Sequence, residues 1–275
     1  FPINLFLSIL IIFSDLEKKE LYFEAINNFI KWNNFNFVFK IYHYFTIHNY
    51  QPEHILRNII FNKNKIKTIS IKQTFSESIY DVSNTYYNNV MQAYNYFKFE
   101  FHWGNESVRM SNLNESKSEN IMNAGIIWAD KNIICNTPKS INDFLIKNKN
   151  KIFIGMFTTA LNLEDGDVND VESHLGFLLF AKDLLKKNDD YRIIIKTKYN
   201  ITNIIDRNVF PEITNAVNDL SNSGKVMFIY NYPRASILIN KCDITISMPF
   251  TSSLPEAIVQ NKKSFFLDIN NNFEK

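Results

Sequence analysis

The stretch Ile244-Thr-Ile-Ser-Met-Pro-Phe-Thr-Ser-Ser-Leu-Pro-Glu-Ala257 is the part of this chain from which its fold is most readily inferred. It begins as a short apolar strand and continues into a helix, so it predicts a turn at the carboxyl end of a strand. In an open parallel α/β sheet, ligands bind at this edge. Three consecutive hydroxyl side chains, Thr251 to Ser253, stand beside the free N–H groups of a helix start. This arrangement suits an anionic ligand such as a phosphate.

Part of this stretch has a simpler interpretation as a helix cap. Ser253 and Glu256 form the S-x-x-E pattern of a capping box, and Pro255 stands in the first turn, where its missing N–H costs nothing. The cap is the better explanation of Ser253 and Glu256. Thr251 and Ser252 then remain as candidate ligands.

Strands and helices alternate regularly from Lys151 to Leu267, which predicts a parallel sheet with right-handed crossovers, a Rossmann-like domain. The predicted strands are 151–158, 191–197, 225–229, 244–248 and 264–267, and the predicted helices are 175–187, 211–220, 234–241 and 254–260.

The first half predicts a second α/β domain. Its expected strands are 35–44, 66–72, 97–102 and 125–128, its expected helices are 17–31 and 82–94, and 111–123 reads as a surface loop. The Lys- and Asn-rich run 142–151 predicts a linker, which gives domains 1–147 and 148–275. We expect two Rossmann-like domains facing across a cleft that holds the active site, with both ends of the fold cut short and the closing C-terminal helices missing.

Composition excludes several classes of function. The 275 residues are 45% hydrophobic and 21% charged, as in a soluble globular protein, and a net charge of +2 is too small to indicate a nucleic-acid partner. Cys135 and Cys242 lie beside apolar residues and outside any C-x-x-C, which predicts buried free thiols in a reducing compartment. The apolar segment Ile3–Phe13 has only about half the length of a membrane span, so a buried strand or helix explains it better.

Familiar catalytic motifs are absent from the sequence. It contains no dinucleotide-binding G-x-G-x-x-G, Walker A, zinc-protease H-E-x-x-H or G-x-S-x-G motif. The acidic run 164–172 lacks the glycine and glutamate of a calcium loop, so it predicts a solvated loop that supplies acidic residues to a helix start. We therefore expect no metal site.

Further candidate ligands follow the other predicted strands of the second domain. Lys196 and Lys198 end one strand, where a lysine either reaches a phosphate or points to solvent, and both interpretations stay open. Arg234 either makes a bidentate contact with a phosphate or simply stands at the start of a helix. Tyr232 either stacks on a base or packs in the core.

Two histidines are candidates for proton transfer. His102 ends a predicted strand of the first domain, and His174 follows the acidic run, so both would border the expected cleft. A lone histidine is more often structural than catalytic, and that interpretation weighs against both.

These residues together resemble a known family. Tyr232, a short helix, and Asp243 at the start of a strand are followed by Pro249-Phe-Thr-Ser252 and by Glu256-Ala257. This order resembles the bacterial polysaccharide-biosynthesis proteins named for a PFTS motif, most closely over 151–268. The resemblance implies a glycosyltransferase of the two-Rossmann GT-B type, with a looser similarity to CDP-glycerol glycerophosphotransferases.

The resemblance implies a cytoplasmic enzyme that moves a sugar from a nucleotide-activated donor to a growing cell-surface polysaccharide. The acceptor would be a glycan or a lipid-linked glycan, and peripheral association with the inner membrane is left open. No cofactor or metal is implied, because the nucleotide-sugar is a substrate and protein groups stabilise its leaving phosphate. The implied donor-binding residues are Lys196, Lys198, Tyr232, Arg234, Pro249, Phe250, Thr251, Ser252, Ser253 and Glu256.

Within this set the resemblance implies separate roles. Thr251 and Ser252 would hold the donor phosphate, and Lys196 or Lys198 would neutralise the leaving nucleotide. Glu256, where it is more than a cap, would bond a ribose or sugar hydroxyl. His102 would be the general base of the acceptor domain.

Other functions remain open. A CDP-polyol phosphotransferase would bind its CDP at the same sheet edge. A sugar-nucleotide epimerase shares the scaffold and would turn over without an acceptor. A non-catalytic subunit of a polysaccharide assembly system would show no turnover.

Overall fold

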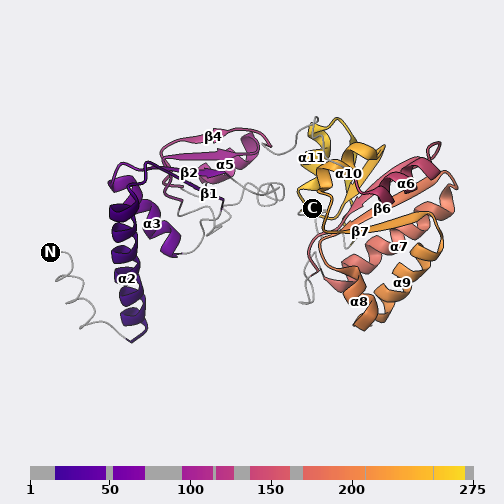
Figure 1. Ribbon diagram of the computed structural model, residues 1–275, viewed down its shortest axis with the longest axis horizontal. Helices are drawn as coiled ribbons and strands as arrows, with labels where there is room; N and C mark the ends of the chain where they lie inside the picture. The colour runs from indigo at the N-terminus through magenta and orange to yellow at the C-terminus, as the bar shows by residue number, and fades with distance from the viewer. Residues whose placement is uncertain are drawn as a thin grey trace. The chain divides into compact units, whose positions relative to one another are not determined.

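The computed structural model describes residues 16–47, 52–71, 95–113, 116–126, 137–161, 170–207, 209–249 and 251–269. These residues fall into two compact units (Figure 1). Described residues up to Gly125 form unit 1, and those from Ile126 onward form unit 2.

Unit 1 contains a parallel sheet with the strand order β1-β2-β3-β4. Its strands are β1 (His43–Thr46), β2 (Lys67–Ile71), β3 (Phe99–His102) and β4 (Ile121–Asn123), and its described helices are α2 (Leu16–Phe39), α3 (Pro52–Lys63) and α5 (Asn105–Leu113). Helices α2 and α3 pack on each other and on β1 through aromatic rings. The Phe61 ring lies edge-on to Trp32 at 5.8 Å and to Tyr44 at 5.1 Å.

The predicted strand 35–44 is wrong over most of its length, because α2 continues to Phe39. The Phe35 ring lies 5.7 Å from Trp32 and 4.7 Å from Phe39, and these contacts at spacings of three and four residues are those of a helix. The alternating Phe-Asn-Phe-Val-Phe pattern imitates a strand, but the helix that precedes it propagates through it.

The remaining predictions for unit 1 have mixed outcomes. The strands at 66–72 and 97–102 and the helix beginning near residue 17 are confirmed. The predicted loop 111–123 is wrong at both ends, where α5 finishes and β4 forms. Residues 125–126 are not a strand. The predicted segments 3–13, 82–94 and 127–128 lie outside the described residues.

Unit 2 contains a five-stranded parallel sheet with the strand order β7-β6-β5-β8-β9. Its strands are β5 (Ile152–Phe157), β6 (Tyr191–Thr197), β7 (Val226–Tyr230), β8 (Ile244–Ser247) and β9 (Lys263–Phe266). Its helices are α6 (Lys139–Lys147), α7 (Val171–Lys187), α8 (Ile201–Arg207), α9 (Pro211–Asn222), α10 (Ala235–Lys241) and α11 (Ser253–Val259). Every strand and helix predicted here is confirmed; α6 and α8 were not predicted.

Two apolar cores cover the two faces of this sheet. One core joins Ile193 and Ile195 of β6 to α7 and α9, and the other joins Ile194 to α10 and α6. Strand alternation explains the division, because neighbouring residues of a strand point to opposite faces. Buried Cys242 belongs to the second core as a free thiol, as predicted. Cys135 lies outside the described residues.

The predicted linker 142–151 is wrong, because α6 occupies most of it and packs into unit 2. Ile141 is fully buried in the second core, with Phe144 and Leu145 packed against it. Unit 2 therefore begins before α6, and the boundary lies earlier than the predicted 147/148. The segment 142–151 is polar in composition because only one face of this short helix is apolar.

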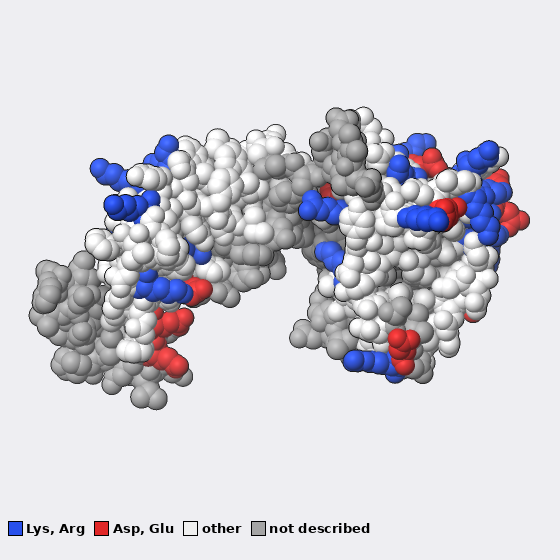
Figure 2. Space-filling view, in the orientation of Figure 1, with Lys and Arg blue, Asp and Glu red and all other residues white. Residues whose placement is uncertain are grey.

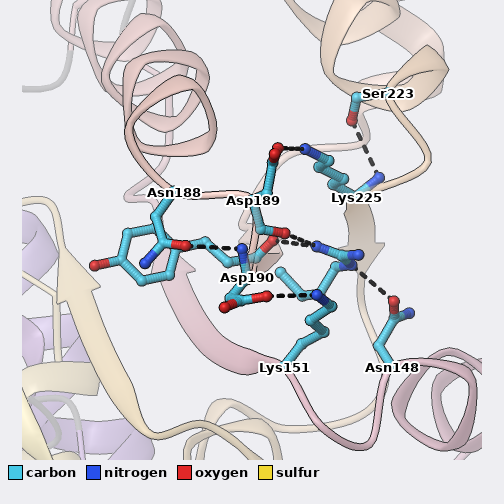
Figure 3. A network of polar contacts seen from close by, with 9 residues as sticks. Asn148, Lys151, Asn188, Asp189, Asp190, Ser223 and Lys225 are labelled. Carbon is cyan, nitrogen blue, oxygen red and sulfur yellow. Dashed lines mark hydrogen bonds and ion pairs between the residues drawn. The ribbon is translucent and has the colours of Figure 1, made fainter.

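The amino-terminal edge of the sheet is joined by a polar network (Figure 3). Lys225 contacts Asp189 at 2.7 Å, Lys151 contacts Asp190 at 2.5 Å, and Arg192 Nε donates to Asn148 Oδ1 at 2.7 Å. The network links the starts of β5, β6 and β7. Since its carboxylates are exposed, its ion pairs contribute little stability.

The strand order places a switch point beside β5. From β5 the chain builds β6 and β7 on one side, and it then returns to build β8 and β9 on the other. The carboxyl ends of β5 and β8, paired at Phe157 and Ser247, therefore border the crevice in which open α/β sheets bind ligands.

Candidate functional site

The residues at this crevice come from the carboxyl ends of four neighbouring strands. Thr158 follows β5, Lys198 follows β6, and Tyr232 and Arg234 follow β7. After β8 comes the turn 248–252, which leads into α11. Phe250 lies outside the described residues, and Pro249 is buried.

A chain of buried hydroxyls closes the turn after β8. The Thr251 hydroxyl donates to the Met248 carbonyl at 3.0 Å, and the Ser253 hydroxyl donates to Thr251 Oγ1 at 2.9 Å. Because the Ser253 proton is used there, the Ser247 hydroxyl must be the donor of the 2.8 Å bond to Ser253 Oγ. Thr251 and Ser253 thus fix the shape of the turn.

The predicted capping box does not form. Helix α11 begins at Ser253, its N-cap is Ser252, and the Ser252 side chain makes no capping hydrogen bond. Ser253 is already helical and turns its hydroxyl into the buried chain instead. Local sequence spacing alone had predicted the cap, whereas the hydroxyl of Ser247, six residues earlier, competes for the same side chain.

Glu256 is the most perturbed carboxyl group at this edge. It is 7% exposed, and burial raises the pKa of its carboxyl group to about 7, against the opposing effects of a hydrogen bond with Ser252 and of the charges of Arg234 and Lys198. The structure therefore brings Glu256, Ser252, Arg234 and Lys198 together. A buried carboxyl with a perturbed pKa and cations beside it is typical of functional sites.

The loop after β7 presents an aromatic ring next to this cluster. Tyr232 is 57% exposed, so it does not pack in the core. The Lys196 ammonium donates to the Asn231 carbonyl in the same loop, and burial lowers the pKa of Lys196. Lys196 therefore holds the loop in place rather than pointing to solvent, and Arg234 is the N-cap residue of α10.

His174 lies near the start of α7, one turn after the N-cap Asp170, whose carboxylate accepts from Ser173 N at 2.8 Å. Its ring is 1% exposed and lies edge-on to Tyr199 at 5.2 Å. Burial lowers the pKa of His174 to about 4, although the nearby Ala160 backbone and the Asp170 charge oppose this shift. His174 is therefore neutral at pH 7 and has no exposed nitrogen.

His102 ends β3 in unit 1 and is fully buried. Its Nδ1 lies 2.6 Å from the Ser107 hydroxyl, and its Nε2 lies 3.2 Å from Glu100 Oε1. Glu100 also accepts from Asn95 at 2.7 Å. In this arrangement His102 belongs to a buried polar cluster, and its ring is not exposed to solvent.

Two further threonines lie at the crevice, and neither was among the predicted site residues. Thr158 and Thr159 are buried directly after the central strand, and the Lys198 backbone N–H donates to the Thr158 hydroxyl at 3.4 Å. The Met-Phe-Thr-Thr run at the end of the first strand of this sheet was the available signal.

Among the residues that the structure describes, no group of three or more His, Cys, Asp or Glu side chains could hold a metal ion. Within the same residues, none of the helices is both long enough and apolar enough to cross a bilayer.

Comparison with known proteins places the chain in a sequence family. The family described as "Polysaccharide biosynthesis PFTS motif protein" matches residues 6–275. No curated protein matches it by sequence.

Solved structures share the fold of this chain at low sequence identity. A co-structure of S. aureus MnaA with UDP has a TM-score of 0.57 at 13% identity. The match covers 88% of this chain and 61% of the MnaA chain. UDP-GlcNAc 2-epimerase from Neisseria meningitidis, bound to UDP-GlcNAc, has a TM-score of 0.55 at 14% identity, covering 91% and 66%. A glycosyltransferase from Rickettsia africae has a TM-score of 0.51 at 15% identity, covering 89% and 62%.

These similarities confirm the predicted fold class, two Rossmann-like units of the GT-B type. The chain spans about three fifths to two thirds of the length of these structures. The cleft between the units stays a prediction.

Proposed function

This chain belongs to the PFTS-motif family of polysaccharide biosynthesis proteins, and on that basis we propose that it is a glycosyltransferase using a nucleotide-diphosphate sugar. The acceptor hydroxyl oxygen forms the new bond to the anomeric carbon, and the bond from that carbon to the diphosphate oxygen breaks. The proton of the acceptor hydroxyl leaves to the departing diphosphate or to water. Negative charge develops on the leaving diphosphate in this step, so the enzyme must supply groups that stabilise that charge.

The observation that carries the proposal is the cluster at the carboxyl edge of unit 2. Glu256 is a buried carboxyl group with a pKa of about 7, hydrogen-bonded to Ser252 and within the electrostatic influence of Arg234 and Lys198. Beside the switch point of a parallel sheet, the two cations suit the negative diphosphate of a nucleotide, and the carboxyl group suits its neutral ribose hydroxyls.

We assign each member of the cluster a role from its chemistry. Arg234 and Lys198 contact the diphosphate oxygens, and the half-buried Ser252 hydroxyl orients the Glu256 carboxyl group through its hydrogen bond. The Glu256 carboxylate accepts from ribose hydroxyls, which replace part of the solvation lost by burial. Exposed Tyr232 stacks on the base.

The structure leads us to reassign three residues from the sequence prediction. Thr251 and Ser253 shape the turn instead of holding phosphate, since their protons are used inside it. Lys196 positions the loop of Tyr232 through Asn231. We assign no proton-transfer role to His102 or His174, because both rings are buried.

Uridine diphosphate is the first donor nucleotide to test, because two structures with this fold are described with UDP or UDP-GlcNAc. A thermal-shift panel of UDP-, GDP-, CMP- and CDP-activated compounds identifies the base. At a hundredfold excess over its dissociation constant, a ligand adds ~2.7 kcal/mol of stability to the folded state. A melting temperature unchanged by every compound would overturn the proposal and favour a non-catalytic subunit.

An epimerase is the second candidate, because one of these similar structures is a UDP-GlcNAc 2-epimerase. Incubation of the protein with UDP-GlcNAc alone, followed by NMR, separates the two functions. A new UDP-linked sugar formed without acceptor indicates the epimerase. Donor consumption that requires a glycan acceptor supports the transferase, and transfer of a polyol phosphate from a CDP compound would instead indicate the phosphotransferase.

A further inference from the structure

Unit 1 exposes a group of large apolar side chains where α2 turns into β1. We call Phe37, Val38, Phe39, Tyr42 and Phe45 the aromatic patch; they are 83%, 66%, 64%, 77% and 59% exposed. They occupy the last turn of α2, the connection after it, and the edge strand β1. Single exposed apolar side chains are common on a soluble surface, whereas five large ones within one short segment, 37–45, indicate an interaction surface.

Lysines surround the aromatic patch. Lys40 follows α2 directly, and Lys63, Lys65 and Lys67 lie at the end of α3 and the start of β2, all exposed. The Lys67 N–H donates to the Tyr42 carbonyl at 3.0 Å, so the lysine-rich turn lies against the patch. None of these four lysines forms an ion pair with any described residue.

Acidic residues are nearly absent from this part of the chain. Between Ala25 and Phe75 the sequence contains one, Glu53. Figure 2 shows most of the basic side chains of this unit at the end where α2 finishes, and the acidic ones nearer to its start. The surface around the patch is therefore positive, because few acidic side chains lie near these lysines to neutralise their charge.

We propose that this surface, the aromatic patch with Lys40, Lys63, Lys65 and Lys67, binds the surface of an anionic phospholipid membrane. Aromatic rings partition into the interfacial region, and lysines beside them contact the headgroups. A protein partner fits less well, because protein interfaces are depleted in lysine.

The position of the surface agrees with such a role. Since the strands are parallel, α2 and α3 end at the edge of the sheet where β1 and β2 begin. The carboxyl edge of the same sheet, where β3 and β4 end, lies at the other end of these strands. Binding through the lysines would therefore leave that edge open to an acceptor.

Co-sedimentation of the full chain with phosphatidylcholine vesicles, with and without phosphatidylglycerol, tests the proposal. We expect binding that requires phosphatidylglycerol and weakens with salt. Lys65→Gln with Lys67→Gln should weaken it ~30-fold, at about fivefold for each lysine. Phe37→Ser with Phe39→Ser should weaken it at least ~10-fold.

Matched controls are available in the same chain. Phe23 is 62% exposed on the same helix but lies beside Glu20 and Glu24, so Phe23→Ser should leave binding unchanged. Lys241→Gln with Lys263→Gln removes two exposed lysines of unit 2 and should also have no effect. Circular dichroism and melting temperature show whether each variant is folded.

Vesicle binding is measured without nucleotide, so it can fail separately from the proposed function. Equal sedimentation of the wild type and the patch variants, or no sedimentation of the wild type, would overturn the proposal. A wild type that is dimeric in solution, becomes monomeric with Phe37→Ser and ignores vesicles would assign the surface to a second copy of the chain instead.

Discussion

Replacing Glu256 by glutamine should change how the free energy of unfolding depends on pH. Burial raises the pKa of this carboxyl from 4.5 to about 7. Between these values the folded protein keeps a proton that the unfolded chain releases, so this contribution to stability is complete below pH 4.5 and is lost as the pH rises through 7. At about 1.4 kcal/mol for each pKa unit, the loss above pH 7 amounts to about 3 kcal/mol.

Glutamine has nearly the shape of glutamate and stays neutral. We therefore expect Glu256→Gln to match the wild type near pH 4 and to be more stable by about 3 kcal/mol near pH 8. Urea unfolding of both proteins across this range measures the difference. Glu212→Gln, at an exposed position on α9, is the control and should show no such divergence. A difference that does not change with pH would refute the assignment of a buried, perturbed carboxyl.

Three further substitutions test other parts of the structure. Thr251→Val leaves the Ser253 hydroxyl and the Met248 carbonyl without their buried partner, so urea unfolding should show a loss of about 1–3 kcal/mol; unchanged stability would contradict the buried hydroxyl chain. The pKa of His174 drops from 6.5 to about 4 on folding, so this residue should cost the wild type about 3 kcal/mol of stability as the pH falls from 6.5 to 4. His174→Phe should not show this loss, and parallel pH profiles of the two proteins would argue against it. Gly155→Ala puts a Cβ 2.9 Å from Cys242 Sγ and 3.0 Å from the Phe157 ring, which should cost about 1–3 kcal/mol in thermal unfolding, and a neutral effect would show that this contact is loose.

The two units differ in how well their sequence predicts their fold. In unit 2 short β-branched runs alternate with helical segments, and both periods agree with the packed structure, as Ile193, Ile194 and Ile195 illustrate by filling opposite cores in turn. In unit 1 the run Phe35–Phe39 has the period of a strand, yet ring contacts with Trp32 and helix propagation keep it helical. Tertiary contacts decide such segments, and periodicity alone does not reveal them.

The site could be predicted as an edge, but its hydrogen bonds could not. Parallel strands bring their carboxyl ends together, so the sequence was sufficient to predict Lys198, Arg234, Ser252 and Glu256 as neighbours. The partner of each hydroxyl was beyond reach, because Ser253 bonds Ser247 across the turn and Lys196 bonds Asn231 across two strands. These long-range hydrogen bonds distinguish the residues that shape the site from the residues that we propose bind the donor.

Isothermal titration of a UDP-linked sugar into the wild type, Arg234→Gln and Arg207→Gln tests the central claim most directly. Arg207 is an exposed arginine of the same unit, in the last turn of α8, and serves as the control. A charge-assisted hydrogen bond contributes about 1.5–3 kcal/mol, so Arg234→Gln should weaken binding by about 10- to 100-fold while Arg207→Gln leaves it unchanged. Equal affinity in all three proteins would contradict a nucleotide-sugar site at this edge of the sheet, and no binding to the wild type would exclude UDP as its donor nucleotide.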